Sequence, residues 1–289
     1  MAHVIDATPS KLEPVHPHRI ILQPQSGWQA IDLKELWAYR ELLYFLTWRD
    51  IKVRYKQTSL GAAWAILQPL MTMIVFSLFF GKMAGISSGD LPYPIFVFAG
   101  LLPWTFFANA VSGAGQSVVG SERLITKVYF PRIMIPLSAV LAGLLDFAIA
   151  CGMLAVLMLY YGVVPQPGIV LAPVLVAGIT LAAIGVGTLL AALTVSYRDF
   201  RYVVPFMVQL WMFGTPSVYM HPDKLGQGPW RTILPLNPAY GLIANFRASV
   251  LGGPIDAYSL GVSMAVASAL FVIGSLYFRR VERGFADVI

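Results

Sequence analysis

Six apolar stretches dominate the chain between residues 62 and 278. A helix needs about 20 mostly apolar residues to cross the hydrocarbon core of a bilayer. Stretches that reach or approach this length lie at residues 62–84, 94–116, 133–161, 169–195, 203–220 and 258–278. The pattern predicts an all-α membrane protein with six transmembrane helices.

The composition agrees with a membrane protein. Of the 289 residues, 57% are hydrophobic and only 12% are charged, whereas about a quarter of an average soluble domain is charged. So few charged residues cannot cover a soluble globule of this size. The composition therefore excludes an ordinary cytoplasmic enzyme, a disordered protein and a nucleic-acid-binding domain. The single Cys excludes a disulfide framework and a Cys-based metal site.

The positions of Lys and Arg predict the orientation. With six spans, the N-terminal tail, the second-to-third loop, the fourth-to-fifth loop and the C-terminal tail lie on one side. These segments hold sixteen of the 20 Lys and Arg residues. Because short cytoplasmic loops carry the excess of basic residues, both termini are predicted to be cytoplasmic in the inner (plasma) membrane. This distribution accounts for the net charge of +6 without a nucleic-acid partner.

Two elements outside the spans are predicted at the N-terminal side. Residues 1–30 are rich in Pro and His and lack an apolar core of signal-peptide length, so we expect a mobile cytoplasmic tail before a transmembrane domain at 31–289. Residues 33–46 are predicted to form an amphipathic helix capped by Asp32, with Glu35 in its first turn. Its apolar face would comprise Leu33, Leu36, Trp37, Leu43 and Tyr44. The adjacent cations favour a helix in the membrane interface over a helix packed on the protein itself.

The outer segment 221–257 is too apolar for a simple loop. Asn237 followed by Pro238 is typical of a helix start. Apolar residues then follow at near-helical spacing. We expect short re-entrant helices here that dip into the outer face of the membrane, with Asn237 as a cap and not as a ligand.

Four cations, Arg49, Lys52, Arg54 and Lys56, precede the first span directly. The simpler interpretation is a topology signal that also contacts anionic lipid. The alternative is recognition of a phosphate-bearing substrate head at the cytoplasmic mouth, since the Arg guanidinium binds phosphate through two parallel hydrogen bonds. Similarly, the short, mixed-charge loop 121–132 is predicted to be helical, and it either docks a partner or merely connects two spans.

Asp146 is the one acid deep within a predicted span. Such acids are costly in a membrane and are candidates for function. No Lys, Arg or His lies at matching depth in another span, so the sequence favours a structural role, with Asp146 protonated or hydrogen-bonded to a neighbouring helix. Gln68, Asn109 and Gln209 are similar candidates for polar contacts between helices.

The motifs of soluble catalytic folds are missing. The chain contains no Walker A loop, and the stretch 112–116, which superficially resembles an ABC ATPase signature, lies within an apolar helix. The chain is therefore not expected to hydrolyse ATP. The chain also lacks suitably spaced pairs of acids and the D-x-D, G-x-S-x-G and H-E-x-x-H motifs. The sequence therefore gives little support to a membrane enzyme.

Several blocks along the chain resemble one transporter family. The chain is similar to the ABC-2 type permeases for polysaccharide and polyol-phosphate export, which include the O-antigen, capsule and teichoic-acid exporters. The resemblance covers roughly residues 33 to 285. Its first block is the most specific, and the others gain weight from their order. The matching blocks are Arg49 to Gly61 with Trp64, Leu67 and Pro69-Leu70, then Leu102-Pro103-Trp104, Leu124 to Arg132, Tyr197-Arg198-Asp199, and Asn237-Pro238 with Arg247.

The resemblance implies a permease homodimer bound to two ABC ATPase subunits. ATP and Mg would bind those subunits, and no cofactor would bind this chain. A lipid-linked glycan would pass through a channel between the protomers, which spans 1 and 5 would line. The coupling helix in the ATPase cleft would comprise Glu122, Arg123, Leu124, Lys127, Tyr129 and Phe130, and the residues near the substrate entrance would be Arg49, Lys52, Arg54, Tyr55 and Lys56.

Aromatic side chains suggest where sugars would be held. Sugar faces are apolar, and aromatic planes bind them without fixing their register. The candidates are Trp64, Trp211, Phe213 and Tyr219, which would equally suit lipid-facing or core positions. The leading function is thus a permease for an O-antigen-like lipid-linked polysaccharide. The alternatives are an ABC-2 permease for a drug or small lipid, a membrane enzyme acting on lipid-linked sugars, and a passive channel or scaffold.

Overall fold

The computed structural model describes residues 33–56, 63–86, 88–89, 91–220 and 228–285. All regular structure in these residues is helical, which confirms the predicted all-α class. The predicted tail at 1–30 and the predicted cap Asp32 lie outside the described residues.

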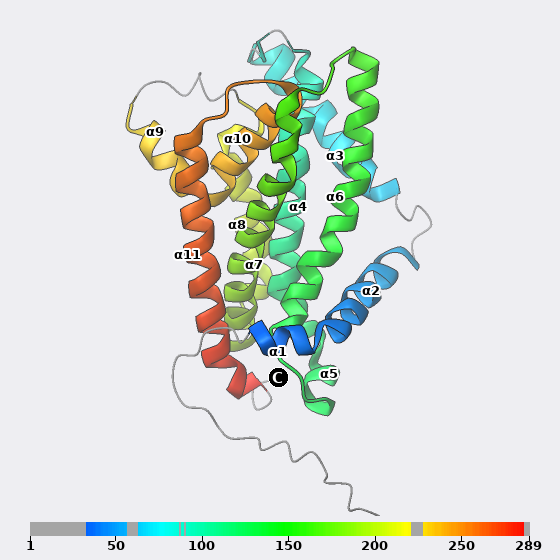
Figure 1. Cartoon of the computed structure of the whole chain (residues 1–289), viewed down its shortest axis with the longest axis vertical. Coiled ribbons are helices and arrows are strands. Elements are labelled where there is room, and N and C mark those ends of the chain that lie inside the picture. The colour runs from blue at the N-terminus through cyan, green and yellow to red at the C-terminus, as the bar shows by residue number, and fades with distance from the viewer. Residues whose placement is uncertain (1–32, 57–62, 87, 90, 221–227, 286–289) are drawn as a thin grey trace, which may run out of the picture.

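Five helices in the described part of the chain are long and apolar enough to cross a membrane, and most stand upright in Figure 1. They match five of the six predicted spans closely. They are α3 (Ala63–Phe76) continued by the π-helix η1 (Ser77–Met83), α4 (Tyr93–Gly120), α6 (Met134–Tyr161), α7 (Ala172–Ser196) preceded by the 3₁₀ turn η2 (Pro167–Leu171), and α11 (Ala257–Val281) followed by the 3₁₀ turn η6 (Glu282–Gly284).

The fifth predicted span, 203–220, is not one continuous helix. Helix α8 spans Phe200–Phe213, and the short 3₁₀ turn η3, Pro216–Val218, follows it. Fourteen residues of helix reach only about 21 Å, less than the roughly 30 Å of a bilayer core. Gly214 and Thr215 interrupt the helix because a residue before Pro disfavours the helical conformation. The predicted six spans therefore correspond to five full-length helices and one shorter one.

Helix α4 lies at the centre of the bundle. It packs against α3, α6, α7 and α8, and also against α10. Its apolar side chains, among them Phe98 and Phe107, are almost entirely buried. The helix therefore acts as the core around which the other spans are placed.

Helices α7 and α11 pack with their backbones in close contact. A Cβ atom added to Gly274 would collide with the backbone oxygen of Gly185, and one added to Gly185 would collide with the backbone of Phe271. Small residues permit this approach between membrane helices. Gly185 of the fourth span therefore lies at a close contact between two helices.

The segment before the first span forms two helices instead of one. Helix α1 spans Leu33–Ala38 and α2 spans Arg40–Lys56, with a break at Tyr39. The predicted single helix over 33–46 was therefore wrong in its bounds. No Gly or Pro occurs between residues 33 and 56, so the helix continues through the basic cluster.

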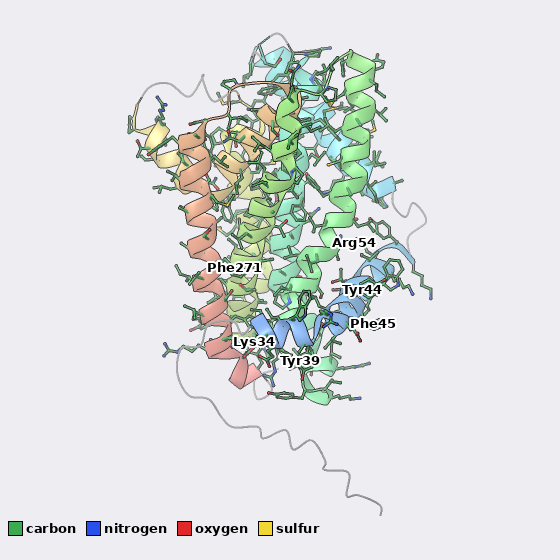
Figure 2. The ribbon with its side chains drawn as sticks, viewed as in Figure 1. Lys34, Tyr39, Tyr44, Phe45, Arg54 and Phe271 are labelled. Carbon is green, nitrogen blue, oxygen red and sulfur yellow. The ribbon has the colours of Figure 1, made fainter. Side chains whose placement is uncertain are left out.

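These two helices also have two apolar faces where one was predicted. Leu36 and Leu43 pack against the bundle beside the buried Leu46, whereas Trp37 and Tyr44 are 71% and 64% exposed. The leucines thus pack on the protein itself. The aromatic rings, among them that of Tyr44 in Figure 2, are left on the surface, where the membrane interface suits them.

The short elements at the opposite end of the bundle from α1 surround helix α10, Pro238–Leu251 (Figure 1). The Asn237 side chain accepts a hydrogen bond from the Ala239 amide, 3.1 Å, so the predicted cap is confirmed. Almost every residue of α10 is buried. The other short elements there are η3, α9 (Trp230–Ile233) and η5 (Leu234–Leu236).

A second apolar cluster ties together the end of the bundle where α1 lies. The connecting helix α5 spans Glu122–Lys127, and its Ile125 is buried with Leu46 of α2, Val195 of α7 and Phe278 of α11. The Arg279 guanidinium also pairs with Glu35 of α1, at 3.0 Å. Helices α1, α2 and α5 and the ends of α7 and α11 therefore meet at one end of the bundle.

Candidate functional site

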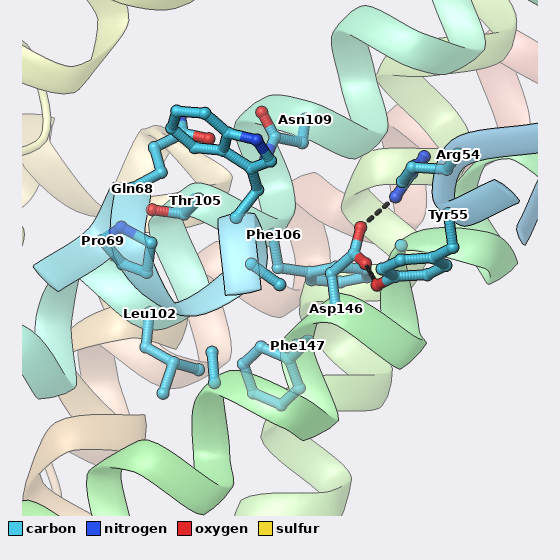
Figure 3. A pocket seen from close by; sticks show the side chains of 14 residues that line it. Arg54, Tyr55, Gln68, Pro69, Leu102, Thr105, Phe106, Asn109, Asp146 and Phe147 are labelled. Carbon is cyan, nitrogen blue, oxygen red and sulfur yellow. Dashed lines mark hydrogen bonds and ion pairs between the residues drawn. The ribbon is translucent and has the colours of Figure 1, made fainter. Parts of the chain in front are cut away.

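A cavity of about 390 Å³ opens where the end of α2 meets the membrane-spanning helices α3, α4 and α6 (Figure 3). Its polar lining comes from three spans and from α2. Gln68 lies on α3, Asn109 on α4 and Asp146 on α6, and Arg54 and Tyr55 reach in from α2. These residues are far apart in the sequence, so the tertiary fold creates the cavity.

Asp146 is the centre of the polar cluster. Arg54 Nη1 donates a hydrogen bond to Asp146 Oδ2, and the Tyr55 hydroxyl donates to Oδ1 (Figure 3). Of the two alternatives left open for Asp146, the structure shows hydrogen bonds to a neighbouring helix, α2. The partner cation of Asp146 lies outside the spans, because Arg54 is on α2.

The position of Asp146 shows how deep this cluster lies. Asp146 is about 18 Å along α6 from the end where that helix begins. Helix α2 packs along α6, and a hydrogen bond of 2.9 Å from the Ser138 hydroxyl to Asp50 joins the two helices nearer that end. Helix α2 therefore carries Arg54 well into the bundle.

The environment of Tyr55 keeps its hydroxyl protonated. Burial is the main cause that raises its pKa to about 12, and the hydrogen bond to the Asp146 carboxylate adds to the effect. The positive charge of Arg54 opposes the shift. At neutral pH the Tyr55 hydroxyl is therefore a hydrogen-bond donor, and Asp146 is its acceptor.

The walls of the cavity are apolar and aromatic. Phe106 of α4 and Phe147 of α6 lie in the wall with their ring centroids 5.5 Å apart. Trp64, at the start of α3, also lines the cavity, and its side chain is 52% exposed. A few polar groups between aromatic walls are typical of a small-molecule site.

The other three predicted entrance cations stay on the surface of α2. Arg49 pairs with the neighbouring Asp50, 2.8 Å. The Lys52 ammonium lies 5.4 Å from the centroid of the Trp48 ring. Lys56 is exposed at the end of the helix. Of the five residues predicted at the entrance, the structure places Arg54 and Tyr55 in the cavity.

Helix α5 presents a charged surface on an apolar anchor. Ile125 and Phe130 are each 5% exposed and belong to the second apolar cluster. Leu124 is half-buried against the same cluster. The exposed members of the predicted coupling set are Glu122, Arg123, Lys127 and Tyr129. Phe130 therefore packs within this chain, and four polar or aromatic side chains are left free to meet a partner.

The four predicted channel aromatics do not lie together. Trp64 lines the cavity, whereas Trp211 lies near the C-terminal end of α8 and does not line it. The Trp211 indole donates to Asn237 Oδ1 at 3.0 Å, and its ring packs edge-on against Phe107 with centroids 5.2 Å apart. Trp211 thus connects α8 to α10.

Phe213 is the last residue of α8 and Tyr219 follows η3, and neither lines the cavity. The Tyr219 ring stacks on Phe80 with centroids 5.0 Å apart, and its hydroxyl donates to the Phe213 carbonyl at 3.0 Å. The Phe213 side chain is 53% exposed. Of the four rings, only Trp64 and Phe213 are free to stack on a ligand.

Sequence reasoning did not group Gln68 and Asn109 with Asp146. Each is a polar residue in an apolar helix, which is a signal that can be read from the sequence. Their convergence on one cavity depends on how α3, α4 and α6 pack, and no spacing in the sequence encodes that packing.

Comparison with known proteins agrees with this architecture. A model of the ABC-2 type transporter family matches residues 41–251. The O-antigen export system permease protein RfbA of Myxococcus xanthus is 32% identical over 259 residues, which cover 89% of this chain and 98% of that protein. RfbA of Klebsiella pneumoniae is 27% identical over 86% of this chain and 95% of its own length. The polysialic acid transport protein KpsM of Escherichia coli is 24% identical, with 81% and 91% covered.

The family match spans well over half of the chain, and the matched region includes every polar residue of the cavity. With its bundle of long apolar helices, this membrane-embedded chain belongs to the ABC-2 type transporter family.

Proposed function

We propose that this chain is the permease subunit of an ATP-driven ABC exporter. It moves an O-antigen-like, lipid-linked polysaccharide from the cytoplasm across the inner membrane. The observation that carries the proposal is the similarity to the M. xanthus O-antigen export permease, which extends over nearly the full length of both proteins.

A separate ATPase dimer supplies the energy in this proposal. The sequence has no Walker A loop, so ATP and Mg bind the partner and no cofactor binds this chain. Helix α5 is the proposed docking element because its exposed Arg123 and Lys127 stand on a buried anchor. That anchor includes Leu46 of α2 and Phe278 of α11. A displacement of α5 by the ATPase would therefore be transmitted through this packing to α2, the helix that carries Arg54.

The substrate enters beside α2. The pyrophosphate of a lipid-linked glycan needs cationic, multidentate donors, and Arg54 is a cation that lines the cavity. Its side chain is 42% exposed, so an arriving anion can reach it from outside. Lys52 and Lys56, exposed on the same helix, attract the anion toward this position.

Two copies of the chain form the channel in this proposal, with both termini of each copy in the cytoplasm. Helices α3 and α8 have large exposed apolar faces, which include Met71 and Phe79 on the first span and Phe206 and Leu210 on α8. These faces suit a contact between copies or with lipid. In this proposal α3 and α8 lie beside the shared pathway, as the family resemblance implies.

The test is reconstitution of transport. The chain is co-expressed with the ATPase encoded beside its gene, and the complex is placed in vesicles with lipid-linked glycan from the same host. We expect ATP-dependent movement of the glycan. We expect Arg54→Glu to reduce export without changing assembly, and Arg231→Glu, a charge reversal at an exposed position of the short helix α9, to leave export intact.

Three outcomes contradict the proposal. No ATPase associates with the chain, or the complex moves a small drug or lipid but no glycan, or the chain alone modifies the glycan chemically. Normal export by Arg54→Glu would reject the role of Arg54 in capturing the head group.

A further inference from the structure

Two exposed amides in the membrane-spanning helices have no partner within the described part of the chain. Gln68 on α3 and Asn109 on α4 both line the cavity, and neither side chain has a hydrogen bond to another described residue. A polar group facing hydrocarbon without a partner is costly. Their presence on otherwise apolar helices therefore indicates that the cavity holds a polar ligand or water and not lipid.

The carboxylate opposite them has unused capacity. Each oxygen of Asp146 accepts one hydrogen bond, from Arg54 or from Tyr55. An ionised carboxylate offers about four acceptor sites, so about two remain. The same two donors hold the carboxylate in a fixed orientation, which prepares it to accept from the hydroxyl groups of a ligand.

Aromatic faces complete the lining. Trp64 is exposed at the edge of the cavity, and Phe106 lies in its wall. One carboxylate and two amides, which accept and donate hydrogen bonds, next to an indole plane match a ring with hydroxyl groups around its edge and an apolar face. A long hydrocarbon chain would leave the amides and the carboxylate without partners.

We propose that this cavity binds one or two sugar residues of the glycan, with Asp146, Asn109 and Gln68 contacting hydroxyl groups and Trp64 stacking on a ring face. The proposal rests on the proposed function and assigns a site within a single copy of the chain. A volume of about 390 Å³ lies at the small end of the range for ligand pockets, about 300–1,000 Å³, so the site holds a short segment of a glycan.

This site separates the sugar from the phosphate. Asp146 and Arg54 pair within the cavity, and the Arg54 side chain is 42% exposed, so it can still meet phosphate at the edge of the cavity. A neutral sugar next to the pyrophosphate would thus occupy the cavity while the pyrophosphate stays at α2.

The first test measures whether water and sugar reach the cavity. In a Cys151→Ser background, which removes the chain's only Cys, Asn109→Cys is treated with the membrane-impermeant thiol reagent MTSET in inside-out vesicles. Val272→Cys, on an exposed apolar face of α11, is the matched control. We expect Asn109→Cys to react and Val272→Cys to stay unreactive.

The probe is the neutral oligosaccharide released from the host's polysaccharide, without lipid or phosphate. We expect it to slow the labelling of Asn109→Cys at least threefold, and we expect inorganic pyrophosphate to have little effect. Four results would each overturn the sugar assignment. Asn109→Cys does not react, or geranylgeranyl phosphate protects it and the oligosaccharide does not. Alternatively, pyrophosphate alone protects it, or it forms a disulfide between two copies.

The second test uses export by the complex with its ATPase. Gln68→Leu and Asn109→Leu each remove one proposed hydrogen bond to the glycan. Each variant should therefore raise the glycan concentration needed for half-maximal export by about three- to tenfold. Gln116→Leu is the control, since Gln116 is also an exposed amide on α4, two turns along, and does not line the cavity.

The two proposals fail in different ways. If the wild-type complex moves no glycan, the proposed function fails. If it moves glycan and both leucine variants behave like Gln116→Leu, the sugar site fails and the proposed function stands.

Discussion

Asp146, in the middle of membrane-spanning helix α6, is hydrogen-bonded to Arg54, which lies at the end of α2 outside the spans. The pair joins the helix that precedes the first span to the core of the bundle. Because both side chains are partly exposed, at 22% and 42%, water screens the attraction and a ligand can compete for either partner.

The first prediction separates a structural role of this pair from a role in substrate capture. In a double-mutant cycle of Arg54→Gln and Asp146→Asn, we expect the coupling in the free energy of unfolding to stay below about 1 kcal/mol, as for other partly exposed pairs. Export should fall much further in Arg54→Gln than in Arg54→Lys. A coupling of several kcal/mol with equal export in both variants would assign the pair to stability alone.

The second prediction concerns pH. The pKa of Tyr55 is raised from 10.0 to about 12 in the folded protein. The stability that this shift contributes is complete below pH 10 and is lost as the pH rises toward 12. Tyr55→Phe should therefore lose less thermal stability between pH 10 and pH 12 than the wild type does. Tyr129→Phe, at a tyrosine that is 71% exposed, is the control. An identical pH slope in Tyr55→Phe and wild type would contradict the prediction.

The third prediction addresses coupling to the ATPase. Reversing the charges of Arg123 and Lys127 together should reduce glycan-stimulated ATP hydrolysis and export by about tenfold, because like charges placed at an interface repel. Arg198→Glu changes an exposed charge in the loop before α8 and should retain activity. Intact ATP-coupled export in the α5 double variant would reject α5 as the coupling element.

The fourth prediction tests the contact between α7 and α11. Gly274→Leu forces a side chain against the backbone of Gly185 and should lower the free energy of unfolding by about 3 kcal/mol. Gly261→Leu on the same helix meets open space and should change stability little. Thermal unfolding of the two purified variants makes the comparison, and equal midpoints would show that the helices separate without cost.

The fifth prediction concerns Asn237. Its side chain accepts from the Trp211 indole and the Ala239 amide and donates to the Thr215 hydroxyl at 2.8 Å. Asn237→Ala should cost about 2–3 kcal/mol. Asn237→Asp keeps the acceptors and loses the donor, so its midpoint in a thermal unfolding assay should lie between those of the wild type and Asn237→Ala. A wild-type midpoint for Asn237→Ala would mean that the cap is dispensable.

Elements that depend on local pattern were predictable. Five of the spans were located within a few residues, because the length of an apolar run is a property of the chain alone. The cap at Asn237 followed from its position before Pro238. The exception, α8, shows the limit of such patterns: an apolar run reports hydrophobicity, whereas Gly214 and the Thr215-Pro216 step decide where the helix ends.

The two faces of α1 and α2 were not predictable from spacing. Leu36 and Trp37 are adjacent and equally suitable for an apolar face, but one packs on the bundle and the other is exposed. The choice depends on which side of each helix meets the second apolar cluster, whose other members, such as Ile125 and Phe278, lie far away along the chain.

By itself the sequence determined that this is a membrane protein built from long helices, with a family likeness carried by blocks such as Arg49 to Gly61. Those properties depend on composition and order along the chain. Only the tertiary structure decided that Arg54, Gln68, Asn109 and Asp146 share one cavity. The physical reason is that burial and hydrogen bonding act between neighbours in space, and the packing of α2, α3, α4 and α6 makes these four residues neighbours.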